Sequence, residues 1–120
     1  MRRFRLAMAQ INATVGDLEG NAHKVMEMID EARLQGADLV SFPEMVIPGY
    51  PPEDLLFKPQ FIRDNLHQLQ RIVQHSTDIA VVVGFADSDH GNTHNAAAVI
   101  SDGILVGVYH KLYLPNYGVF

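Results

Sequence analysis

The chain has no cysteine among its 120 residues, so it forms no disulfide bond and offers no thiol as a nucleophile. Basic residues are few as well: nine Lys and Arg stand against fourteen Asp and Glu, for a net charge of −5. Nucleic acids and anionic membrane surfaces attract clustered Lys and Arg, so we expect neither as a partner. No apolar run approaches the roughly 18 residues that span a bilayer. These absences favour a soluble, cytoplasmic protein.

Apolar residues are plentiful: at 48% they predict a real hydrophobic core, and the length allows one modest domain. Near the start they alternate with a period of two, which is typical of a strand, and later they recur at the spacing of an amphipathic helix. These patterns predict strands at 4–9, 39–42, 79–85, 95–100 and 104–111, and helices at 22–32 and from Pro59 onward. This order predicts an α/β fold with a mixed sheet. The unbroken apolar run at 79–85 further indicates a strand covered on both faces.

The segment 113–120 is too apolar for a loose tail, but it closes no element of this plan. A sheet that stopped there would leave an unpaired edge, which intact proteins usually cover. We therefore expect residues 1–120 to be the amino-terminal part of a longer protein.

Two residues that can do acid–base chemistry come directly after predicted strands. Glu44 follows the apolar run 37–43, and Lys111 follows the apolar run 104–109 and His110. In open α/β sheets, ligands bind beyond the carboxyl ends of strands, so we expect both side chains in one crevice. An ammonium group lowers the pKa of a neighbouring carboxylate, so Glu44 would stay ionised and accept a proton. Lys111 would stabilise a developing oxyanion, but a covalent nucleophile is missing.

The segments around these residues resemble the nitrilase, or carbon–nitrogen hydrolase, superfamily. The similar segments are 41–45 (Ser-Phe-Pro-Glu-Met), His110-Lys111, 9–12 and 15–21. Two longer segments, 49–56 and 111–120, look like the amino-terminal glutaminase domains of glutamine-dependent NAD⁺ synthetases. The resemblance covers essentially the whole chain. It implies the nitrilase-like α-β-β-α sandwich with mixed sheets, of which residues 1–120 would be the amino-terminal portion only.

This resemblance also implies a Glu–Lys–Cys triad. Glu44 would activate the cysteine, Lys111 would stabilise the tetrahedral intermediate, and Tyr117 would contact bound L-glutamine. The cysteine would lie beyond residue 120, so residues 1–120 alone should not hydrolyse glutamine and need no cofactor. Ammonia would pass through a tunnel to an absent synthetase domain, which would use it with ATP and Mg²⁺ on deamido-NAD⁺. The family also implies a homo-oligomer.

Other functions fit the same residues. A stand-alone nitrilase-type amidase would use the Glu–Lys pair on another small amide, and a non-catalytic scaffold or oligomerisation module would keep only the fold. The polar residues Asp87, Asp89, His90 and His94 raise the further alternative of a divalent metal site, because Asp and His are metal ligands. Their turn-like context favours a solvated hairpin loop, so we expect no metal.

Overall fold

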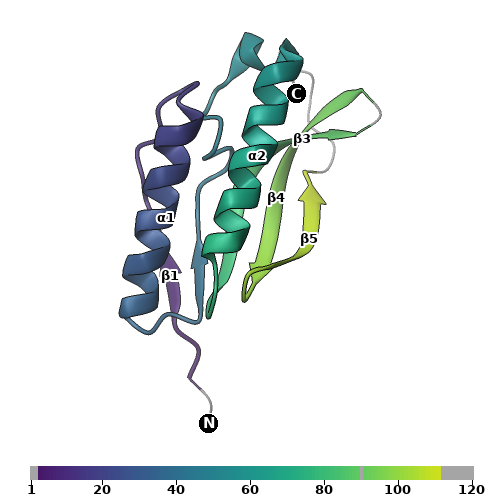
Figure 1. Cartoon of the computed structure of the whole chain (residues 1–120). Coiled ribbons are helices and arrows are strands. Elements are labelled where there is room, and N and C mark those ends of the chain that lie inside the picture. Colours follow the sequence, from purple (N-terminus) through teal and green to yellow (C-terminus); the bar gives the residue numbers. More distant parts are fainter. Residues whose placement is uncertain (1–2, 90, 112–120) are drawn as a thin grey trace.

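The computed structural model describes residues 3–89 and 91–111 of the chain (Figure 1). The elements in chain order are β1 (Leu6–Met8), α1 (Leu18–Leu34), β2 (Leu39–Ser41), the 3₁₀ helix η1 (Glu53–Phe57), α2 (Pro59–His75), β3 (Ala80–Asp89), β4 (Asn92–Ser101) and β5 (Ile104–His110). The predicted order of strands and long helices is confirmed. None of the helices in the described ranges is long and apolar enough to cross a membrane.

The strands form one sheet in the order β1-β2-β3-β4-β5, so each strand pairs with the next one along the chain. β1, β2 and β3 are parallel, whereas β3, β4 and β5 are antiparallel, which confirms the predicted mixed α/β sheet. Parallel neighbours need a crossover connection, and α1 and α2 provide the two crossovers. Both helices lie on the same face of the sheet (Figure 1).

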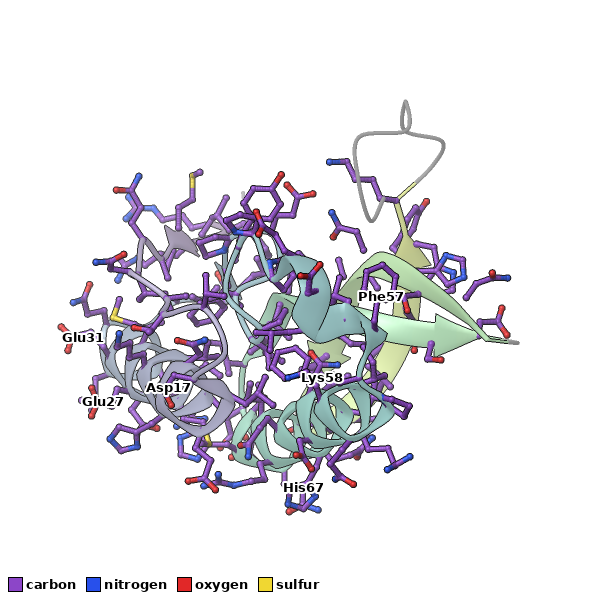
Figure 2. The ribbon with its side chains drawn as sticks, turned by 90° about the horizontal axis from the view of Figure 1, so that it is seen from above. Asp17, Glu27, Glu31, Phe57, Lys58 and His67 are labelled. Carbon is purple, nitrogen blue, oxygen red and sulfur yellow. The ribbon has the colours of Figure 1, made fainter. Side chains whose placement is uncertain are left out.

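The core lies between the two helices and the sheet. α1 contributes Ala22, Val25 and Ile29, all fully buried, at the helical spacing that the sequence predicts. Charged and polar side chains of the helices point the other way, as Figure 2 shows for Glu27, Glu31 and His67. The helices are therefore amphipathic covers whose apolar sides close one face of the sheet.

The opposite face of the sheet carries no second layer within the described residues. Leu6 and Met8 of β1 are 51% and 77% exposed, and Val82 of β3 is only partly buried. Within the described residues both helices pack on one side of the sheet, so cover on the second face of 79–85 stays a prediction. Alternate side chains of β3, such as Val81 and Val83, reach the core.

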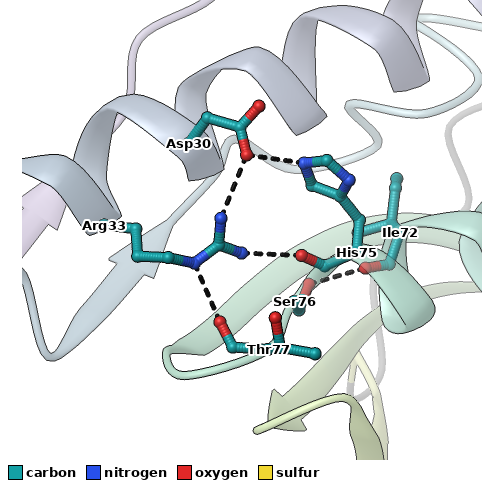
Figure 3. Close-up of polar contacts among 6 residues, drawn as sticks. All are labelled: Asp30, Arg33, Ile72, His75, Ser76 and Thr77. Atoms are coloured by element: carbon teal, nitrogen blue, oxygen red, sulfur yellow. Dashed lines mark hydrogen bonds and ion pairs between the residues drawn. The ribbon is translucent and has the colours of Figure 1, made fainter.

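A polar cluster joins α1 to the end of α2 (Figure 3). Arg33 of α1 donates to the backbone carbonyl oxygens of His75 and Thr77, at 2.7 and 2.8 Å. Asp30 accepts from Arg33 at 3.0 Å and lies 2.7 Å from Nε2 of His75. The last carbonyl groups of a helix have no partner inside it, so this guanidinium caps α2 from the neighbouring helix.

The boundaries of α1 and of the β3–β4 hairpin differ from the sequence prediction. α1 begins at Leu18 rather than at residue 22, because the Asp17 side chain accepts from the backbone N–H of Gly20 at 3.1 Å and caps the helix. β3 continues to Asp89 and β4 begins at Asn92, so most of the predicted polar loop is paired strand. The backbone hydrogen bonds of the two strands extend the hairpin through residues whose side chains are polar.

Candidate active site

Glu44 lies in a tight turn directly after β2. The turn passes close to β3, and the backbone N–H of Ile47 donates to the carbonyl oxygen of Gly84 at 3.2 Å. A β-carbon on Gly84 would lie 2.5 Å from the backbone nitrogen of Met45 and 2.7 Å from the carbonyl oxygen of Pro43. Real β-carbons essentially never approach backbone atoms so closely, so the turn requires glycine at position 84.

Buried side chains hold the rest of this turn. Asn21 of α1 is fully buried and donates to the carbonyl oxygens of Ile47 and Thr14, at 2.9 and 2.8 Å. Met45 has a φ of +53°, a left-handed conformation that is uncommon for a residue with a side chain, and its side chain is fully buried beside Leu56. Backbone fixed by β3, by α1 and by the core can hold a catalytic group in one position.

Lys111 follows β5 and reaches Glu44 from across β4. Its backbone N–H donates to the carbonyl oxygen of Asn95 at 2.9 Å, which continues the pairing of β5 with β4. Its Nζ donates to Oε1 of Glu44 at 2.8 Å, although the two residues are 67 positions apart in the chain. The structure therefore brings together the two side chains that the sequence singled out.

Sequence reasoning missed Asn95, which is buried on β4 and donates from Nδ2 to the same Oε1 of Glu44. Ser101 pairs with Ile104 at the hairpin turn, and a regular hairpin from that pair would place Asn95 opposite His110. A β-bulge shifts the register by one residue, so Ala96 pairs with His110 and Asn95 bonds to Lys111. The available signal was a lone asparagine at the head of the apolar run 96–100.

These contacts keep Glu44 ionised. The hydrogen bond from Lys111 lowers the pKa of Glu44 below its ordinary value; partial burial opposes this change, and the donor from Asn95 adds to it. The Glu44 and Lys111 side chains are 44% and 46% exposed, so the ion pair itself contributes little to folding stability. An accessible carboxylate beside an ammonium group can accept a proton while the cation stabilises negative charge on a substrate.

The two side chains line a pocket of about 470 Å³, within the range of small-molecule sites. Its lining is mostly apolar, and its members are Phe42, Pro43, Glu44, Val82, Gly84, Asn95, Ala96, Ala97, Val99, Tyr109 and Lys111. Val82 and Val99 alternate along their strands with core residues, so the pocket lies on the sheet face away from the helices. None of these described lining residues is Cys, Ser or Thr, so they offer a base and a cation but no thiol or aliphatic hydroxyl nucleophile.

Of the other residues singled out in the sequence, Asp87 and His94 do not line this pocket. Tyr117 lies outside the described residues, as does His90. Asp87 lies 2.7 Å from Nε2 of His110, and the ring of His94 stacks on that of His110 with centroids 4.1 Å apart. In residues 3–89 and 91–111, no group of three or more His, Asp or Glu side chains is arranged to hold a metal ion.

The sequence of this chain is similar to those of known proteins. Residues 5–119 match the family model described as carbon-nitrogen hydrolase. Over its whole length, the chain is 50% identical to a glutamine-dependent NAD(+) synthetase from Thermotoga maritima and 40% identical to one from Acinetobacter baylyi. It spans 21% and 22% of those two relatives, about a fifth of their length.

Solved structures show the same arrangement of elements. A glutamine-dependent NAD(+) synthetase from Cytophaga hutchinsonii matches with a TM-score of 0.90 at 29% identity, over 94% of this chain and 20% of that one. An amidase from Nesterenkonia sp. matches with a TM-score of 0.81 over 95% of this chain and 44% of that one, and its 22% identity shows a likeness of fold alone. Because the family model spans nearly the whole sequence, the chain belongs to the carbon-nitrogen hydrolase family.

Proposed function

We propose that the chain forms the amino-terminal part of a glutamine-hydrolysing domain that supplies ammonia within a glutamine-dependent NAD⁺ synthetase. The observation that carries this proposal is the 2.8 Å contact between Lys111 Nζ and Glu44 Oε1 in an apolar pocket. The 50% identity to the Thermotoga maritima synthetase supports glutamine as the substrate. The chain spans about a fifth of that relative, so the synthetase activity would belong to the rest of the protein.

Glu44 would take the proton from a cysteine thiol of the rest of the protein, because its lowered pKa keeps it ionised at neutral pH. The sulfur then attacks the side-chain amide carbon of glutamine, and Lys111 stabilises the oxyanion of the tetrahedral intermediate. Glu44 returns the proton to the departing nitrogen, so ammonia leaves and a thioester remains. Water then cleaves the thioester to release glutamate, with Glu44 as the base again. Tyr117 would contact the bound glutamine.

The other partners belong to the same proposal. ATP and Mg²⁺ would act on deamido-NAD⁺ in the synthetase part, and we assign no residue of this chain to them. Assembly into a homo-oligomer and a cytoplasmic location stay predictions.

Glu44→Gln in the complete protein that contains this chain tests the proposal. Glutamine keeps the size of the side chain but cannot accept the proton, so glutamine-dependent NAD⁺ formation should fall by about 10²- to 10⁴-fold. Formation from free ammonia should stay near the wild-type rate, because the substitution touches only the amide-cleaving site. Glu27→Gln is the matched control, since Glu27 is exposed on the outer side of α1.

Each other outcome points to a different function. Equal loss with glutamine and with ammonia would remove Glu44 from the proposed role. Full retention of glutamine-dependent activity would favour a non-catalytic scaffold. Cleavage of other small amides without any cleavage of glutamine would favour the stand-alone amidase, whose fold the Nesterenkonia enzyme shares.

A further inference from the structure

Asn95 contacts both members of the Glu44–Lys111 pair. Its side-chain Nδ2 donates to Oε1 of Glu44, and its backbone carbonyl oxygen accepts from the N–H of Lys111 at 2.9 Å. Asn95 is only 7% exposed, so water cannot readily take the place of its amide donor. Asn95 therefore links the Glu44 carboxylate to the end of β5, where Lys111 lies.

Two donors meet the same oxygen of Glu44. Nζ of Lys111 and Nδ2 of Asn95 both donate to Oε1, and within the described residues neither reaches Oε2. An ionised carboxylate has about four lone-pair sites on its two oxygens, so these two donors fill Oε1. A proton that arrives at Glu44 must then bind to Oε2.

We propose that Asn95 is a positioning residue that makes Oε2 of Glu44 the proton-accepting oxygen and holds the carboxylate at a fixed place relative to Lys111. This inference rests on the proposed function, because it requires that Glu44 take a proton during amide cleavage. Asn95 acts through Glu44 and not on the substrate. The terminal torsion of a glutamate is broad, and the amide donor restricts it to the orientation that faces Oε2 toward the incoming proton.

The pH dependence of kcat/KM for glutamine, measured in the complete protein, tests this role. Asn95→Leu removes the donor at similar size, and Asn95→Asp keeps the shape but introduces a carboxylate that repels Glu44. Either change favours the protonated form of Glu44, so the acid limb of the profile should move to higher pH. The shift should be larger for Asn95→Asp, because its carboxylate repels that of Glu44. We expect kcat with glutamine to fall about 10- to 100-fold, with little change in KM.

Two controls separate positioning from folding. Asn92→Leu, at an exposed position on the same strand, should leave the profile unchanged. Ammonia-dependent NAD⁺ formation should stay near wild type in both Asn95 variants, because the synthetase part is untouched.

Contrary outcomes are distinguishable. If Glu44→Gln is inactive with glutamine but both Asn95 variants keep the wild-type acid limb, the role of Asn95 is overturned and the proposed function stands. Loss of ammonia-dependent activity in both Asn95 variants would also overturn it, since Asn95 would then serve folding only. If Glu44→Gln keeps its glutamine turnover, the proposed function fails, and the role of Asn95 fails with it.

Discussion

Replacing Gly84 with alanine tests whether the position of the Glu44 turn controls the chemistry. The added β-carbon would lie 2.5 Å from the backbone nitrogen of Met45 and 3.0 Å from the carbonyl carbon of Glu44. Ordinary van der Waals contact begins near 3.4 Å, so the shorter distance must lengthen from 2.5 Å by about 0.9 Å. The neighbouring atoms are backbone, which cannot swing aside as the end of a flexible side chain can. The turn must therefore move away from β3.

The size of this movement sets the expected effects. Overpacking a well-packed interior costs about 1–3 kcal/mol of folding stability. A misplacement of about 1 Å at a catalytic group can lower a rate by about 10²-fold. Glu44 would carry its carboxylate away from Lys111 and Asn95 as the turn shifts. We therefore expect Gly84→Ala to lower kcat with glutamine by about 10²-fold.

The assay compares glutamine-dependent and ammonia-dependent NAD⁺ formation in the complete protein, together with its thermal unfolding. Gly107→Ala on β5 is the matched control, because a β-carbon there meets no atom within 4 Å. Ammonia-dependent activity should survive in both variants, whereas only Gly84→Ala should lose glutamine turnover and melt earlier. A Gly84→Ala protein with wild-type glutamine turnover would refute the idea that this close contact positions Glu44.

Further changes probe the site and its scaffold. Lys111→Met removes the cation that would stabilise the oxyanion, so kcat with glutamine should fall about 10²- to 10³-fold. It also removes the donor that lowers the pKa of Glu44, so the acid limb of the pH profile should move to higher pH. An unmoved acid limb would contradict this. Arg33→Ala uncaps the end of α2, so urea unfolding should show a loss of about 1–2 kcal/mol. Arg71→Ala loses a hydrogen bond to Gln68 in its own helix, so it should change the stability by no more than about 0.5 kcal/mol. Equal losses in the two variants would count against the cap. The isolated 120-residue chain should self-associate through its uncovered sheet face, and sedimentation that shows a stable monomer would exclude this.

The spacing of apolar residues was sufficient to predict the order of the elements, because one face of each helix and alternate residues of each strand pack in the core. Gly36 marks the end of α1, and its φ of +76° is the left-handed geometry that glycine adopts at little cost. The pattern of apolar residues placed the start of α1 at residue 22, but the helix begins at Leu18, because the cap from Asp17 outweighs the low helix propensity of Gly20. Residue propensities predict local structure well, except where a hydrogen bond from a nearby side chain, such as the Asp17 cap, outweighs them.

The parts of the site that escaped prediction depend on contacts between distant segments. Gly84 reads as an ordinary glycine in an apolar strand until the turn after β2 is seen to pass over it. Asn95 meets Lys111 rather than His110 because the pairing of β4 with β5 shifts by one residue between Val99 and Ile100. Register shifts of one residue leave no mark in a pattern of apolar and polar residues when both flanking runs are apolar.

The sequential order of the strands determines when the Glu44–Lys111 pair can form during synthesis of the chain. Every strand pairs with its neighbour in the chain, so the sheet can grow one strand at a time as the polypeptide leaves the ribosome. The acid arrives with β2, but the amine arrives only after β5 has docked on β4. A nascent chain that has not yet added β5 therefore carries the Glu44 carboxylate without the Lys111 ammonium group, and the ion pair forms only after β5 has docked on β4.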